Sequence, residues 1–176
     1  MASAQDVARL RSDTGAGVME CKRALDEAAG DFEKAKGIIK ERGLSKVAKK
    51  ADREAREGVV EAYIHTGGRI GALVELASET DFVARNPEFK DLARAIAMQV
   101  AAMAPKYVSE EEIPDAEKKD VKPAEVALLA QPYIKDASRT IGDLVTQYAA
   151  TTGENVQVKR FARFELGQTE PENGQA

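Results

Sequence analysis

Residues 70–89 read IGALVELASETDFVARNPEF, and this stretch passes from a strand through a polar loop into a helix. Every second residue from Ile70 to Leu76 is apolar, and a period of two is typical of a strand. Asn86 and Pro87 form a strong helix start, because Asn can cap free amide groups and Pro fits the first helical position. The stretch therefore predicts a sheet that is joined to a helix by a short loop.

The loop carries a large aromatic residue, Phe82, among polar neighbours. Thr80 can cap a single helical turn through Asp81, Phe82 and Val83, which would leave the Phe on a short, rigid projection. In one interpretation Phe82 packs back under the following helix as part of the core, and the local pattern by itself favours this. In the other interpretation Phe82 is an exposed anchor for a partner's pocket, where a buried aromatic contributes roughly 2 kcal/mol or more.

The sequence on either side of the loop predicts a small antiparallel sheet packed with helices. Residues 58–75 read as a hairpin, because Gly67 and Gly68 supply the positive backbone angles that tight turns require. The helix after Pro87 carries an apolar stripe at spacings of three and four, which marks the face that packs on the sheet. That stripe consists of Phe89, Leu92, Ile96, Val100 and Met103.

The rest of the chain adds two helices and a closing strand. An acidic connector at 106–122 precedes a helix at 123–131 and a capped helix at 141–152, which Gly153 ends. Residues 156–164 read as the last strand, with a bulge where the alternation slips by one residue. We expect its aromatic residues to face inward and its cations to face water; they are Phe161 and Phe164, and Lys159, Arg160 and Arg163.

Residues 4–43 predict three short helices. Asp13 and Thr14 offer a cap for the second helix, Gly30 ends it and Asp31 starts the third. The predicted fold class is α+β, with a helical head followed by the sheet domain. The expected divisions are a three-helix module at 1–43, a basic and partly helical linker at 44–57, an α+β core domain for dimerisation and partner binding at 58–167, and a flexible tail at 168–176.

Composition limits the classes of function. The chain has 176 residues, of which 43% are hydrophobic, so it can bury a sizeable core. A net charge of −4 argues against a protein that mainly neutralises phosphates. No apolar run is long enough to span a bilayer or to act as a signal sequence, so the expected location is the cytoplasm. The single cysteine, Cys21, fits a reducing compartment and reads as a small buried hydrophobe.

Catalytic chemistry is not indicated. The chain has one His, His65, and one Cys, and it lacks a serine elbow, a zinc-ligand cluster and a phosphate loop. Gly15 to Gly17 precede a helix, but without a GKS or GKT ending they predict a turn and no direct nucleotide binding. The acidic connector lacks ligand spacing for a metal. We therefore expect no enzyme activity, cofactor or metal; a ribosome- or nucleic-acid-binding module remains the alternative, through the basic linker and last strand.

Four blocks of the sequence together resemble one family. Residues 80–86, TDFVARN, resemble the signature loop of the bacterial elongation factor Ts family, the guanine-nucleotide exchange factors of elongation factor Tu. Residues 10–25, 63–75 and 160–167 resemble its N-terminal module, its first hairpin and its closing strand, in the same order. Ala77 and Ser78 depart from the family's usual Asn-Cys, which leaves the loop itself intact. The resemblance covers nearly the whole chain.

The resemblance implies a fold and a mode of action. The N-terminal module is expected to be ubiquitin-associated-like, and Phe82 to insert into the G domain of elongation factor Tu beside the magnesium and phosphate site. Asp81 would make a polar contact from the same loop. The inserted loop would stabilise a partner conformation in which the metal and the phosphates lose ligands, so that GDP leaves faster. The expected partner-binding residues of this loop are Thr80, Asp81, Phe82, Val83, Arg85 and Asn86.

The resemblance also implies further contacts. The N-terminal module would make a second contact with the G domain, through Leu10, Arg11, Thr14, Gly15, Ala16, Gly17 and Met19. The chain resembles the short form of the family, in which two copies pair through the exposed sheet. The closing region would contact another domain of the partner.

Overall fold

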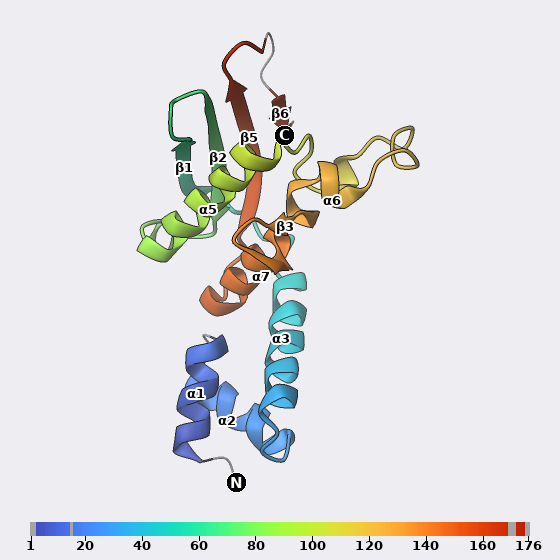
Figure 1. Ribbon diagram of the computed structural model, residues 1–176. Helices are drawn as coiled ribbons and strands as arrows, with labels where there is room; N and C mark the ends of the chain where they lie inside the picture. Colours follow the sequence, from blue (N-terminus) through green and yellow to red (C-terminus); the bar gives the residue numbers. More distant parts are fainter. Residues whose placement is uncertain (1–2, 15, 169–171, 175–176) are drawn as a thin grey trace. The chain divides into compact units, whose positions relative to one another are not determined.

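The computed structural model describes residues 3–14, 16–168 and 172–174, and it has the expected α+β architecture (Figure 1). Its helices are α1 Ala4–Thr14, α2 Val18–Glu27, α3 Phe32–Ala48, α4 Asp81–Ala84, α5 Pro87–Met103, α6 Pro123–Val126 and α7 Ile141–Thr152, with 3-10 turns at Glu110–Glu112 and Leu128–Ala130. Its strands are β1 Glu57–Ile64, β2 Ile70–Ser78, β3 Pro132–Tyr133, β4 Asp136–Thr140, β5 Gln157–Glu165 and β6 Glu172–Gly174. Two compact units result, Met1–Asp52 with Thr146–Glu154, and Arg53–Val145 with Asn155–Ala176.

The first unit contains the predicted three helices, but the second one starts differently from the prediction. Thr14 is the last residue of α1 and its hydroxyl donates to the carbonyl of Leu10, so the expected cap by Asp13 and Thr14 is wrong. Gly17 takes the N-cap position of α2 instead, in an extended conformation. The predicted start of the third helix is confirmed, since the carboxylate of Asp31 accepts from the amide of Lys34.

The third helix runs past residue 43 into the linker, which was expected to be partly helical. It continues to Ala48, so the first part of the linker is helical. Its end packs within the first unit against the second half of α7: a Cβ on Gly43 would lie 3.0 Å from the Cβ of Ala150, and the Lys50 ammonium donates to the carbonyl of Gly153. These tertiary contacts extend a segment whose sequence has little apolar content.

The second unit is built on an antiparallel sheet with the order β1-β2-β5-β6. The hairpin turn is confirmed, with Gly67 and Gly68 at φ 92° and 69°. A register shift between Glu75 and Leu76, opposite β5, confirms the expected irregularity. Strand β6 lies in the segment that was expected to fray, where its backbone pairs with β5. The sheet thus extends beyond the strands that the sequence indicates.

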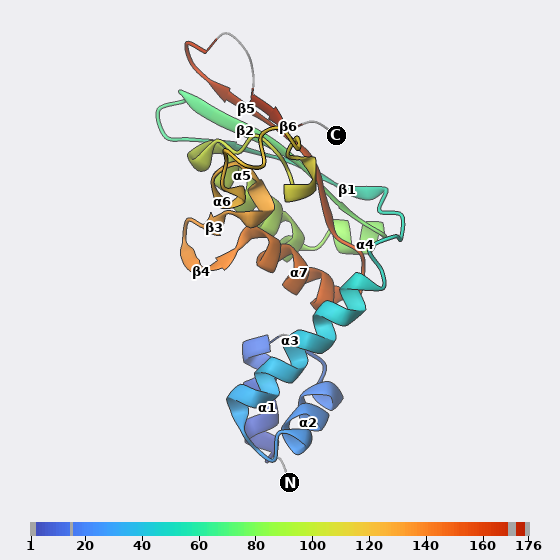
Figure 2. The ribbon, with the colours of Figure 1, turned by 90° about the vertical axis from the view of Figure 1, so that its right-hand side faces the viewer.

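Helix α5 covers one face of this sheet, as its apolar stripe predicts. Phe89, Ile96 and Val100 are fully buried, whereas Met103 at the end of the stripe is exposed. Figure 2 shows the sheet with α5, α6 and the β3–β4 hairpin on the same side. The opposite face of the sheet carries exposed side chains.

The closing strand corrects one expectation. Arg163 is buried, and its Nε donates to the carbonyl of Ala101 in α5 at 3.1 Å. Phe164 is exposed instead, because strict alternation after Phe161 places residue 163 under α5 and residue 164 on the other face. The predicted separation of inward aromatics from outward cations is therefore wrong at these two positions. Arg163 is therefore not available to a nucleic acid on the surface of the last strand.

A buried polar cluster attaches the β3–β4 region to α5. The side-chain amide of Gln99 donates to Gln131 and to the carbonyl of Pro132, while its oxygen accepts from the amide of Ile134 at 2.9 Å. In this region the predicted helix at 123–131 is divided into α6 and a 3-10 turn, and a short hairpin follows. The bounds of α7 agree with the prediction. No helix within the described residues is long and apolar enough to cross a membrane.

Candidate partner-binding site

The loop around Phe82 forms a single capped turn of helix, α4. The hydroxyl of Thr80 accepts from the amide of Val83 at 3.5 Å, which confirms the cap predicted from the sequence. Ala84 is the buried residue of the turn. Arg85 lies at the C-cap, and its guanidinium contacts the carboxylate of Asp81 at 2.8 Å, one turn away.

Phe82 points away from the core. Its side chain is 81% exposed, so the interpretation of Phe82 as a core residue is wrong and the exposed position is the one observed. Ala84, two positions further along the turn, lies on the buried side, so Phe82 lies on the opposite side of the helix. The turn therefore presents a large apolar side chain next to an ion-paired carboxylate.

Asn86 connects this turn to α5 without the cap that its identity suggests. It occupies the N-cap position, but its side chain makes no capping hydrogen bond; its backbone carbonyl accepts from Phe89 and Lys90. Pro87 takes the first helical position, as predicted. The chain thus leaves α4 in an extended conformation and enters α5 at once.

The expected second contact region lies in the N-terminal module, and its residues differ in exposure. Gly15 lies outside the described residues. Leu10 is fully buried, so its side chain can contribute only by holding the helices together. Thr14 and Ala16 are half-buried around Cys21, whose thiol donates to the carbonyl of Ala16. The exposed members of the set are Arg11, Gly17 and Met19.

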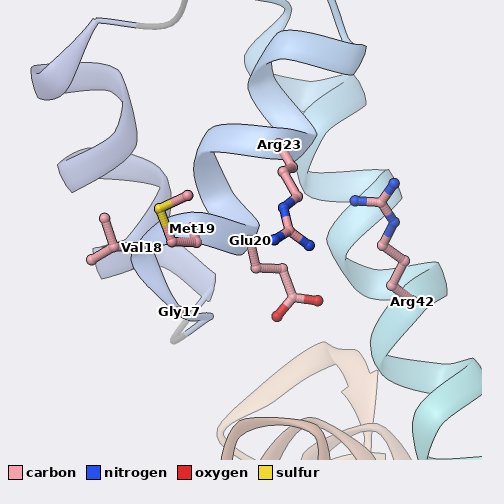
Figure 3. A pocket seen from close by; sticks show the side chains of 6 residues that line it. All are labelled: Gly17, Val18, Met19, Glu20, Arg23 and Arg42. Atoms are coloured by element: carbon pink, nitrogen blue, oxygen red, sulfur yellow. The ribbon is translucent and has the colours of Figure 1, made fainter.

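Met19 lies at the edge of an open hollow between α2 and α3 (Figure 3). The hollow is also lined by Gly17 and Glu20, and by three residues that were not predicted from the sequence: Val18, Arg23 and Arg42. The side chains of Arg23 and Arg42 extend toward the hollow from the two helices, and Arg42 is also ion-paired with Glu27. Arg42 was missed because it lies at the far end of the module in the sequence, and spacing within α2 gave no signal for it.

The open face of the sheet forms a further apolar surface. The strand register aligns Ile64 with Gly71 and Phe164, and Ala62 with Leu73. Val60, Ile64, Leu73, Phe164 and Leu166 are exposed. We call these five residues the open sheet face. Its signal in the sequence is that β1 and β2 are apolar at both odd and even positions, which indicates a strand with two covered faces.

Within the described part of the chain, no group of three or more His, Cys, Asp and Glu side chains could hold a metal ion. The Phe82 turn and the hollow present exposed apolar side chains beside charged ones. Their arrangement suits recognition of another macromolecule.

A family model and several known proteins that match this chain carry the same name. A family model described as elongation factor Ts matches residues 33–123. The elongation factor Ts of Carboxydothermus hydrogenoformans is 50% identical over 196 residues, covering 96% of this chain and 90% of that protein. The proteins of that name from Caldanaerobacter subterraneus subsp. tengcongensis and Coprothermobacter proteolyticus are 47% and 45% identical, and this chain covers 98% of each of them.

Proposed function

Because this chain belongs to the elongation factor Ts family of translation factors, we propose that it binds elongation factor Tu·GDP and accelerates the release of GDP. It acts as an exchange factor and not as an enzyme, since no bond of the nucleotide changes. Its role is to stabilise a conformation of the partner that holds the nucleotide weakly.

The exposure of Phe82 carries this proposal. An aromatic side chain that is 81% exposed on a capped helical turn is available to a partner without rearrangement of the free protein. Preorganisation of this kind reduces the entropy lost on binding. Aromatic anchors of this size commonly dominate the energy of an interface.

The turn then acts as a wedge in the G domain of elongation factor Tu. Phe82 enters beside the magnesium and phosphate site, and Asp81, oriented by its ion pair with Arg85, makes a polar contact from the same turn. The wedge favours a partner conformation in which the metal and the phosphates lose ligands. GDP therefore dissociates faster, and no chemistry on the nucleotide is needed.

Thermodynamic linkage fixes the sign of the coupling between GDP binding and factor binding. If the factor weakens GDP binding by some ratio, GDP weakens binding of the factor by the same ratio. The factor should therefore bind nucleotide-free elongation factor Tu more tightly than the GDP form, and it is released when fresh GTP binds.

The N-terminal module makes the second contact with the G domain. Val18 and Met19 supply exposed apolar surface at the start of α2, and Arg23 and Arg42 supply positive charge at the hollow beside them. This combination fits a partner surface with apolar and acidic residues. The closing region contacts another domain of the partner.

The open sheet face pairs two copies of the chain. Five large apolar side chains are exposed on neighbouring strands, and contiguous apolar surface of this kind marks interfaces between proteins. Ile64 packs over Gly71, where an added Cβ would lie 2.6 Å from its Cδ1, so the absence of a side chain at Gly71 lets Ile64 lie against the sheet. A monomeric mass by light scattering across the working concentration range would remove the dimer from the proposal.

The direct experiment follows release of a fluorescent GDP analogue from elongation factor Tu, with and without catalytic amounts of this protein. Acceleration supports the proposal, and its saturation with factor concentration gives a maximal rate and a half-saturating concentration. Ile134→Ala is a matched control, because Ile134 is an exposed apolar residue on the β3–β4 hairpin and outside the proposed contacts. No acceleration by the intact protein would leave a ribosome- or nucleic-acid-binding role as the alternative.

A further inference from the structure

Three chain segments meet through one carboxylate at the end of the sheet that carries the Phe82 turn. The Glu79 side chain is 20% exposed, and its Oε1 accepts from the backbone amide of Asn155 at 2.7 Å. Its Oε2 lies 3.5 Å from Nη1 of Arg53. The side-chain amide of Asn155, a residue only 3% exposed, donates to the backbone carbonyl of Arg53 at 2.6 Å. We call Glu79, Asn155 and Arg53 the clasp.

The topology of the sheet explains why these residues meet. Strands β1 and β5 both run antiparallel to β2, so each begins where β2 ends. Arg53 precedes β1, Asn155 precedes β5 and Glu79 directly follows β2. The clasp therefore joins the two segments that enter the sheet to the one segment that leaves it toward Phe82.

Glu79 lies between the two residues that set the start of α4. Ser78 on one side is fully buried and its hydroxyl donates to the carbonyl of Thr80 at 3.0 Å. Thr80 on the other side caps the turn. A single helical turn has no stability of its own, and Phe82 adds little packing because it is mostly exposed. The direction in which Phe82 points is therefore set largely by the base of the turn and by the buried Ala84.

We propose that Glu79 is a positioning residue for Phe82: through the clasp it holds the base of α4 so that the exposed ring keeps one orientation. This inference rests on the proposed exchange function. A carboxylate suits the role because its two oxygens accept from two donors on different segments, the Asn155 amide and the Arg53 guanidinium. The Phe82 ring is thereby both exposed to solvent and held in one orientation.

Loss of Glu79 has a kinetic signature that differs from loss of Phe82. If the turn samples several orientations, the apparent affinity falls in proportion to the competent fraction, whereas the complex, once formed, is unchanged. Glu79→Ala should therefore raise the half-saturating concentration for GDP release and leave the maximal rate nearly constant. Phe82→Ala should lower the maximal rate itself.

The test compares Glu79→Ala with a matched control, Glu61→Ala, in the fluorescent GDP release assay. Glu61 lies in the same sheet, its side chain is 25% exposed and it pairs with Arg94 at 3.7 Å, but it is not part of the clasp. We expect Glu79→Ala to raise the half-saturating concentration about fivefold to tenfold and Glu61→Ala to change it less than about twofold. Equal effects of the two variants, or no effect of Glu79→Ala, would overturn the proposal.

A second readout needs no partner. In the free protein the amides of Val83, Ala84 and Arg85 donate within the turn, so their hydrogen exchange reports its order. Glu79→Ala should accelerate exchange at 80–86 and leave the centre of α5 protected. Unchanged exchange at 80–86 would contradict the clasp even if elongation factor Tu does not respond to the wild-type protein, a result that defeats only the exchange function.

Glu79→Gln keeps an oxygen for the Asn155 amide and loses the ion pair with Arg53. We expect it to restore most of the wild-type loop protection and affinity. This variant also tests whether Glu79 positions Phe82 if circular dichroism shows that Glu79→Ala does not fold. A glutamine variant as impaired as the alanine variant would show that the hydrogen bond to Asn155 does not order the turn.

Discussion

Phe82 and Phe89 lie on consecutive helices and have opposite environments. Phe82 is 81% exposed on α4, whereas Phe89 is fully buried on α5. Helix α4 has four residues and α5 has 17, so only α5 has several turns of apolar side chains that can cover a sheet. The same residue type is therefore part of the core in one helix, whereas in the other it is available for the recognition that we propose.

The largest effect on stability should come from Phe89→Ala. Removal of a fully buried phenylalanine leaves a cavity between α5 and the sheet, so we expect the free energy of unfolding to fall by about 3–5 kcal/mol. Urea denaturation followed by circular dichroism measures this change.

Phe82→Ala is the counterpart in the same measurement. The exposed ring has little packing to lose, so the free energy of unfolding should change by no more than about 0.5 kcal/mol. A loss above about 2 kcal/mol would mean that Phe82 contributes to the core, and the contrast between the two helices would fail.

The next effect concerns the bond that holds the end of α5. Arg163→Met removes the donor to the buried carbonyl of Ala101, and we expect a loss of about 1–3 kcal/mol. Arg160→Met is the control, because Arg160 is an exposed residue of the same strand paired with Glu75. If both variants lose the same stability in urea denaturation, burial of Arg163 does not explain its role.

The last comparison of stability concerns the two helix caps. Thr80→Ala removes an observed cap and should destabilise the α4 turn by about 1 kcal/mol, seen as faster hydrogen exchange at 80–86. Asn86→Ala should change exchange at the start of α5 very little, because its side chain makes no capping hydrogen bond. A larger change in hydrogen exchange for Asn86→Ala than for Thr80→Ala would show that the observed capping hydrogen bonds do not explain the stability of these helix starts.

Local patterns predicted much of this fold. The period of two in β2, the apolar stripe of α5 and the glycine turn at 67–68 each give a signal within a few residues, and the structure agrees with them. The cap at Thr80 also followed from residue type and spacing. These features depend on near neighbours in the sequence.

The remaining features depend on distant contacts. The exposure of Phe82 could not be predicted from its polar neighbours in the sequence, because it depends on how α5 and the sheet pack around the turn. The burial of Arg163 depends on the carbonyl of Ala101. The clasp joins Glu79 to Asn155, and Arg42 enters the hollow from α3, so neither was predictable from local spacing.

The most direct test of the account is the maximal rate of GDP release from elongation factor Tu, measured for the wild-type protein, Phe82→Ala and Ile134→Ala. We expect strong acceleration by the wild type and by Ile134→Ala. We expect a loss of about 30-fold or more in Phe82→Ala, the equivalent of roughly 2 kcal/mol, with its fold intact by circular dichroism. Equal maximal rates for the wild type and Phe82→Ala would contradict the claim that the exposed phenylalanine drives exchange.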